Sequence, residues 1–192
     1  MTAHIVVLAS GTGTLFEALL DSELGTSVVG LVSDQPGARA VEVARSRGIP
    51  VRTIPLIDFD SRELWESELL MQIKELNPDL IVSAGFMRIL SPVFVNQFPE
   101  QIINSHPSLL PQFPGAHAVR DAIEAGVTVT GCTVHFIDEG VDTGKIISQE
   151  QVDVRPGESE GQLHERIKIV ERTLLPQSVE RLLIERLGKG FQ

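Results

Sequence analysis

Apolar residues in this chain fall into short runs that alternate with segments of helical periodicity. Four runs, at residues 4–9, 27–33, 51–54 and 80–84, are mostly branched aliphatic and end at turn-forming residues. Short apolar runs of this kind are typical of strands that are buried on both faces. We therefore predict four strands in the first half of the chain.

The segments between these runs have the pattern of helices. One helix is predicted to begin near Thr14, with three apolar residues on one face: Leu15, Ala18 and Leu19. A second spans residues 38–47 and is closed by Gly48. A third is capped by Asp60 or Ser61, ends before Pro78, and has apolar residues every three or four positions: Trp65, Leu69, Ile73 and Leu76. Successive strand and helix units predict a parallel, doubly wound, Rossmann-like sheet with helices on both faces.

The rhythm changes after residue 101. A short strand at 102–105 and a helix at 116–125, ended by Gly126, are followed by two longer strands at 127–136 and 145–154. These two strands are close enough in sequence to pair antiparallel. The last segment, 159–187, has Leu163, Ile167, Val170 and Leu174 at helical spacing, and Pro176 is expected to kink or split it. The predicted fold class is α/β, with a mostly parallel sheet and an antiparallel C-terminal part.

Composition limits the classes of function. With 192 residues and 42% hydrophobic content, one domain over 1–192 is expected, with halves at 1–100 and 101–192. The net charge of -10 disfavours nucleic-acid binding. Cys132 is the only cysteine, which excludes an intramolecular disulfide and suits a buried packing role in a reducing cytoplasm. The N-terminus has no signal or membrane-span pattern, so we expect a cytoplasmic protein without a membrane partner.

A glycine-rich turn, SGTGT at residues 10–14, follows the first predicted strand and opens a helix. Backbone N–H groups and the helix dipole converge at such a turn, where a phosphate can bind. The turn lacks the last glycine of the dinucleotide fingerprint, because Phe16 stands there, and no P-loop lysine follows. An ordinary tight turn without a ligand explains the pattern equally well.

The string NSHPSLLPQFPG at residues 104–115 is more informative. Pro107 holds His106 in an extended conformation, and Asn104 and His106, two residues apart, point to the same side. At the carboxyl end of a strand they can donate together to a developing oxyanion. The alternative is that Asn104 caps a turn and His106 is a structural core histidine.

An acidic loop, DEGVDTG at residues 138–144, lies between the two late strands. By itself it reads as a hairpin connection with solvated carboxylates. Beside His106, a carboxylate from this loop would favour the protonated imidazole. The other histidines show no zinc-binding spacing, and no serine-nucleophile elbow is present, so we expect no metal and no covalent nucleophile.

The two loops together resemble the phosphoribosylglycinamide formyltransferase family, and the resemblance extends to GTGT, to DSRE at 60–63 and to AGFMRILSP at 84–92. It implies a formyltransferase fold and the catalytic trio Asn104, His106 and Asp142. It also implies a phosphate and ribonucleotide site, formed by Gly11, Thr12, Gly13, Thr14, Leu15 and Glu171. The implied folate site comprises Arg62, Met87, Arg88, Ile89, Leu90, Asn104, Asp138, Glu139, Gly140 and Val141. Leu15 departs from the polar residue common in the family, so the Thr14 hydroxyl and backbone amides are expected to bind phosphate.

By this resemblance the chain formylates the amine of glycinamide ribonucleotide, with 10-formyltetrahydrofolate as co-substrate, in purine biosynthesis. Its partners would be these small molecules, and the chain a monomer or homodimer. Formyltetrahydrofolate hydrolase and methionyl-tRNA formyltransferase share the trio, but both carry further domains, and the acidic charge disfavours tRNA. Two other classes are alternatives: a noncatalytic nucleotide-binding or regulatory domain, and a NAD-dependent oxidoreductase with Asp34 as its one candidate ribose-binding acid.

Overall fold

The computed structural model describes residues 3–189. The chain forms two compact units, with the boundary between Ile103 and Asn104. Within the described residues, hydrogen bonding joins the strands into a seven-stranded sheet in the order β3-β2-β1-β4-β5-β6-β7. The strands before residue 100 pair parallel, and the last two pair antiparallel, which confirms the predicted fold class.

The first unit is built from strand and helix alternation. Its elements are β1 (Ile5–Leu8), α1 (Thr14–Leu20), η1 (Glu23–Ser27), β2 (Val28–Ser33), α2 (Arg39–Ser46), β3 (Val51–Thr53), η2 (Leu56–Asp58), α3 (Arg62–Glu75), β4 (Leu80–Ser83) and α4 (Pro92–Val95). All four residues of β1 are fully buried, because β1 lies between β2 and β4. The carboxyl ends of these parallel strands share one edge, and the segments that follow β1, β2 and β4 carry Ser10, Asp34 and Arg88.

The helices of the first unit begin and pack largely as predicted. Ser61, not Asp60, caps α3, since its hydroxyl accepts from Leu64 N at 3.3 Å. In α1 the buried side chains are Phe16 and Leu19, whereas Leu15 and Ala18 are only half-buried. The inward face of α1 is therefore formed by Phe16 and Leu19, whereas the predicted face was Leu15, Ala18 and Leu19. The short elements η1, η2 and α4 were not predicted, because one or two turns are too short to show a helical period.

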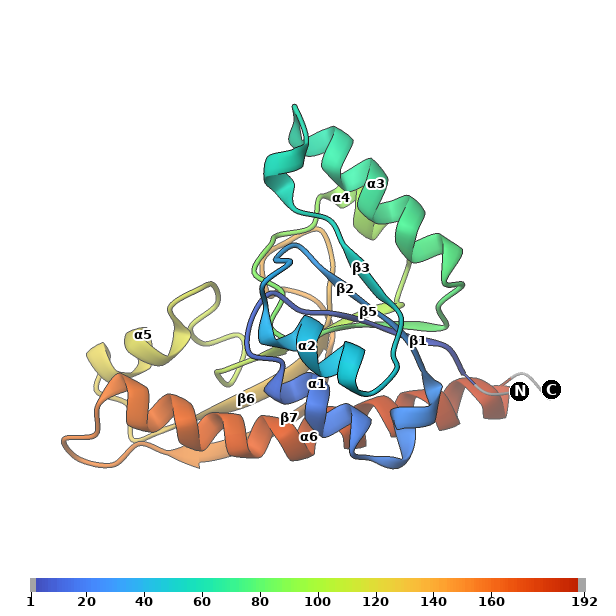
Figure 1. The fold of residues 1–192 in the computed structure, drawn as a ribbon. Helices are drawn as coiled ribbons and strands as arrows, with labels where there is room; N and C mark the ends of the chain where they lie inside the picture. The colour runs from blue at the N-terminus through green and yellow to red at the C-terminus, as the bar shows by residue number, and fades with distance from the viewer. Residues whose placement is uncertain (1–2, 190–192) are drawn as a thin grey trace. The chain divides into compact units, whose positions relative to one another are not determined.

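The second unit combines a helix pair with an antiparallel hairpin. Its elements are β5 (Ile102–His106), whose last three residues belong to it, α5 (Ala118–Glu124), β6 (Val129–Phe136), β7 (Ile146–Asp153) and α6 (Glu160–Lys189). β6 and β7 pair antiparallel from Val129 opposite Asp153 to His135 opposite Ile146. α6 runs along this hairpin (Figure 1). A buried cluster joins them: Val119, Cys132, Val152, Leu163 and Ile167.

Two predictions about this unit can be compared directly with the structure. Cys132 is fully buried, as predicted for a packing residue, and burial raises the pKa of its thiol to about 12. Pro176 is expected to kink or split the last helix, and a split is wrong, because α6 continues through Pro176. Proline removes one backbone hydrogen bond, while the fully buried Leu175 and Val179 anchor the helix on either side.

Among the described residues, no helix combines the length and apolar character needed to cross a membrane.

Candidate active site

His106 and Asp142 meet in the second unit, where β5 ends beside the loop that connects β6 and β7. His106 Nδ1 lies 3.3 Å from Asp142 Oδ2, and the two side chains are 5% and 13% exposed. Asn104 joins them through a further residue: its Nδ2 lies 3.4 Å from His135 Nε2. His135 Nε2 in turn lies 3.5 Å from Asp142 Oδ1. The predicted trio therefore forms one polar cluster around a single carboxylate.

Asp142 is the centre of this cluster. Its Oδ2 also accepts from Gly115 N at 2.8 Å, and its backbone has a φ of 55°, a conformation that aspartate tolerates better than most residues. Burial alone would raise the pKa of this carboxyl. The hydrogen bond from His135, the Gly115 N–H group and the two imidazoles outweigh that effect and hold the pKa of Asp142 below its ordinary value. Asp142 is thus a carboxylate at neutral pH that faces two histidines.

Both ring nitrogens of His106 contact groups of the protein itself. Its Nε2 lies 2.8 Å from the carbonyl oxygen of Phe113, and a carbonyl can only accept, so Nε2 carries a proton and donates. Its Nδ1 faces Asp142. A doubly protonated ring can donate to both acceptors. A reacting oxygen that takes a hydrogen bond from Nε2 must therefore replace the Phe113 carbonyl, a contact that the sequence does not reveal.

His135 is a site residue that the sequence pattern does not single out. Its Nδ1 donates to Phe136 O at 2.8 Å, which fixes the ring and turns Nε2 toward Asp142 and Asn104. Histidine spacings typical of metal sites are absent around it, so motif inspection passes it over. Its place at the end of a predicted strand, just before the acidic loop, was the available signal.

Glu171 is a buried carboxylate on α6. It follows Leu163 and Ile167 at intervals of four residues, so it occupies the inward face of the helix, and it is 5% exposed. Its Oε1 accepts from Ser105 Oγ at 2.7 Å. Burial raises the pKa of Glu171 above its ordinary value, although the Ser105 hydroxyl partly offsets the effect. Glu171 is therefore a buried carboxyl group that is hydrogen-bonded to Ser105 on the inward face of α6.

The raised pKa of Glu171 gives a testable stability effect. The folded protein holds the Glu171 proton to higher pH than the unfolded chain does. The associated stability is therefore present below the ordinary pKa of 4.5 and is lost as pH rises through the folded value. Because glutamine does not titrate, Glu171→Gln is expected to become more stable relative to the unsubstituted protein as pH rises.

Urea unfolding of both proteins from about pH 4.5 to about pH 8 measures this difference. Glu165→Gln is a matched control, because Glu165 is an exposed carboxylate on the same helix and bonds Lys168. A stability difference for Glu171→Gln that stays constant over this pH range would contradict the assignment.

In the first unit, the turn after β1 leads directly into the N-terminus of α1, which begins at Thr14. Gly13 has a φ of 73°, and a Cβ there would lie 2.8 Å from Ala40 Cα, so only glycine fits. No side chain caps the N-terminus of α1. Arg39 donates to Thr12 O at 2.8 Å and pairs with Glu17 at 2.6 Å. The residues of the turn have different exposure: Gly11 and Thr12 are exposed, and Thr14 and Leu15 half-buried.

The folate residues expected in the first unit cluster around the segment after β4. Met87 and Ile89 are 77% and 66% exposed, whereas Leu90 is buried. Arg62 at the start of α3 donates to the Ile89 carbonyl and pairs with Glu66. Arg88 pairs with Asp34, its Nε lying 2.7 Å from Oδ2. Both arginines are thus engaged with groups of the chain itself.

The acidic loop supplies the corresponding residues of the second unit. Asp138 Oδ1 accepts from Gly140 N at 3.1 Å and from Thr143 Oγ1 at 2.7 Å. These bonds turn the chain back on itself before Asp142. Val141 is 47% exposed, and Glu139 is also exposed. The loop is therefore held by its own side chains, as expected for a short turn rich in aspartate and glycine.

Comparison with known proteins assigns the family. The family model described as formyl transferase matches residues 3–179, and the chain belongs to this family. It is an enzyme of the phosphoribosylglycinamide formyltransferase group. The protein of that name from Mycobacterium tuberculosis is 48% identical over 183 residues, covering 94% of this chain and 85% of the relative. The one from Escherichia coli is 40% identical over 177 residues, covering 90% and 84%.

Solved structures give the same result. The crystal structure of phosphoribosylglycinamide formyltransferase from Bacillus halodurans matches with a TM-score of 0.91 and 39% identity. The match covers 98% of this chain and 100% of that one. The resemblance inferred from the two loops, and the formyltransferase fold that it implies, are therefore confirmed.

Proposed function

We propose that this chain transfers the formyl group of 10-formyltetrahydrofolate to the amine of N1-(5-phosphoribosyl)glycinamide in de novo purine biosynthesis. The observation that carries the proposal is the Asp142 carboxylate, which faces both His106 and His135 while His135 contacts Asn104. This arrangement supplies hydrogen-bond donors for an oxyanion, together with a nearby charge partner. The names of the relatives supply the substrate class.

The proposed reaction begins with attack of the glycinamide amine on the formyl carbon of the folate. The C=O double bond opens to an oxyanion, and Asn104 and protonated His106 donate to that oxygen. For this step His106 Nε2 exchanges its bond to Phe113 O for one to the substrate. Asp142 stabilises the positive charge of the imidazolium. One such donor is typically worth about 2.7 to 4 kcal/mol of transition-state stabilisation.

The tetrahedral intermediate then collapses. The C–N10 bond of the folate breaks as the C=O bond re-forms, and the proton lost by the attacking amine passes through water to the leaving N10. In this proposal Asp142 relays that proton, as the family resemblance implies. The products are the formylglycinamide ribonucleotide and tetrahydrofolate. No covalent bond to the enzyme forms, and the chemistry requires neither a metal nor a nucleophilic side chain.

Substrate contacts follow the family pattern in this proposal. Backbone amides of residues 11–15 and the Thr14 hydroxyl bind the phosphate, since the Leu15 side chain cannot. Glu171 binds the ribonucleotide. In the first unit, Arg62 and residues 87–90 contact the folate, and in the second unit residues 138–141 do so. The substrates are small molecules, and the proposed location is the cytoplasm.

An absorbance assay of 10-formyltetrahydrofolate consumption tests the proposal. Turnover is expected with glycinamide ribonucleotide and not without an acceptor. Equal consumption in the acceptor-free control would identify a hydrolase instead. Turnover only with initiator methionyl-tRNA would identify a tRNA formyltransferase, and no turnover under any condition would identify a binding domain.

A further inference from the structure

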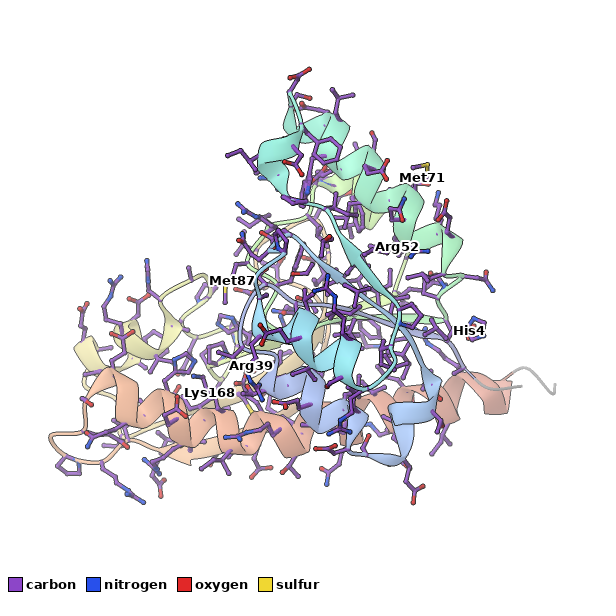
Figure 2. The ribbon with its side chains drawn as sticks, in the orientation of Figure 1. His4, Arg39, Arg52, Met71, Met87 and Lys168 are labelled. Atoms are coloured by element: carbon purple, nitrogen blue, oxygen red, sulfur yellow. The ribbon has the colours of Figure 1, made fainter. Side chains whose placement is uncertain are left out.

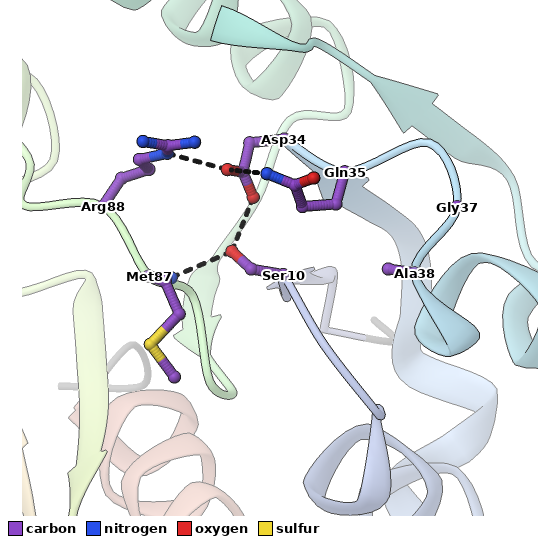
Figure 3. A pocket seen from close by; sticks show the side chains of 7 residues that line it. All are labelled: Ser10, Asp34, Gln35, Gly37, Ala38, Met87 and Arg88. Carbon is purple, nitrogen blue, oxygen red and sulfur yellow. Dashed lines mark hydrogen bonds and ion pairs between the residues drawn. The ribbon is translucent and has the colours of Figure 1, made fainter.

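Asp34 is a buried carboxylate in the first unit that the formyl-transfer chemistry does not use. It directly follows β2, and its side chain is 1% exposed. It accepts from three side chains: Ser10 Oγ at 2.5 Å, Arg88 Nε at 2.7 Å and Gln35 Nε2 at 3.1 Å (Figure 3). A buried carboxylate is costly unless it is paired and hydrogen-bonded, and this one is both. Its three partners come from three different segments of the chain.

Ser10 extends the network to the segment after β4. Its Oγ accepts from Met87 N at 2.9 Å, and its own N–H donates to Gly85 O at 3.1 Å. A serine hydroxyl has a single proton. Because that proton goes to Asp34, the lone pairs of the oxygen remain available for the Met87 N–H group. Asp34 therefore determines the direction of the Ser10 hydroxyl and, through it, the anchoring of Met87.

The same groups border a cavity. Ser10, Asp34, Gln35, Gly37, Ala38, Met87 and Arg88 line a volume of about 540 Å³ (Figure 3), and Figure 2 labels Met87 among the other side chains. This size lies within the range of small-molecule sites. The Met87 side chain is largely exposed, and Arg88 is held by its Nε. Asp34 thus fixes one apolar and one cationic residue at the border of a cavity.

We infer that Asp34 is a positioning residue for folate binding, which acts by fixing the Met87 backbone through Ser10 and the guanidinium of Arg88 directly. The inference rests on the proposed assignment of residues 87–90 to the folate. Asp34 does not touch reacting atoms in this scheme. Its contribution is to hold residues 87 and 88 in one conformation before the folate arrives, which lowers the ordering cost of binding.

Asp34→Asn tests the inference, because it keeps the shape of the side chain and removes its charge and one acceptor oxygen. We expect the KM for 10-formyltetrahydrofolate to rise roughly tenfold, equal to about 1.4 kcal/mol. The kcat and the KM for the ribonucleotide should change by less than about twofold, since uniform binding alone is lost. Hydrogen exchange should accelerate at the Met87 amide and not throughout the unit.

Two further variants separate positioning from general stability. Asp21→Asn is the matched control, because Asp21 forms an exposed ion pair with Arg47 at 2.8 Å in the same unit. It should leave the folate KM and the Met87 exchange unchanged. Ser10→Ala breaks the link to Met87 and should raise the folate KM, and combining it with Asp34→Asn should give less than the product of the two effects.

Different experimental results would overturn the proposed function and the positioning role of Asp34. If the unsubstituted protein shows no acceptor-dependent turnover, the proposed function fails. If it is active and Asp34→Asn leaves the folate KM and the Met87 exchange unchanged, the positioning role is overturned. It is also overturned if both KM values and the exchange of the whole unit change together, because that result reports a structural role alone. Should Asp34→Asn not fold, Ser10→Ala decides by the same criteria.

Discussion

His106→Ala is expected to lower kcat for formyl transfer by about 10² to 10³ fold, while the protein still folds and binds folate. The substitution removes an oxyanion donor, and loss of one such donor has costs of this size in other enzymes. Since the donor acts mainly on the transition state, the KM for the folate should change little. Steady-state kinetics with glycinamide ribonucleotide measure the effect, and circular dichroism checks the fold.

His117→Ala is the control for this experiment, because His117 is an exposed histidine in the same unit. Its kcat should equal that of the unsubstituted protein. Full activity of His106→Ala would refute the role of His106 as an oxyanion donor. In that case the contacts of His106 with Phe113 and Asp142 would have a structural role only.

Asp142→Asn should lower kcat by roughly 10 to 100 fold. A hydrogen bond to a charged group contributes about 1.5 to 3 kcal/mol, and that contribution is lost when the carboxylate becomes an amide. The pH dependence of kcat should also change, because the Asp142 carboxyl, whose pKa is lowered in the folded protein, is replaced by an amide that does not titrate. Rates measured across pH for both proteins test this, and an unchanged profile would contradict the coupling of Asp142 to His106.

The same substitution has an expected stability effect with a defined sign. Because the pKa of Asp142 is lowered in the folded protein, its contribution to stability is present above the ordinary pKa of 3.8 and is lost as pH falls through the folded value. Asp142→Asn should thus be less stable than the unsubstituted protein at neutral pH, and the two should converge in acid. Urea unfolding at neutral and acidic pH measures the difference.

The strands and their pairing could be predicted because local residue type determines them. The branched aliphatic runs of β1, β2 and β4 allow few other structures, and the two late strands are joined by a short loop. Elements that depend on tertiary packing are harder to predict from the sequence. α6 continues through Pro176 because Leu175 and Val179 are buried on either side of it. The apolar periodicity of the segment does not show which residues become buried.

Part of the candidate site could be predicted from the sequence for the same reason. Asn104 and His106 stand two residues apart on one strand, so their shared direction follows from the chain itself. His135 and the Phe113 carbonyl reach the cluster only through the pairing of strands and the folding of a loop. The Asp34 network joins residues that are 24 and 54 positions apart, and no local pattern predicts such contacts.

The most direct test of the formyl-transfer account follows the formyl carbon itself. The protein is incubated with 10-formyltetrahydrofolate labelled with ¹³C in the formyl group, together with glycinamide ribonucleotide, and the products are identified by mass spectrometry. The account predicts that the label appears in the formamide of the ribonucleotide, with tetrahydrofolate released in equal amount. Label found as free formate, with the ribonucleotide unchanged, would contradict it.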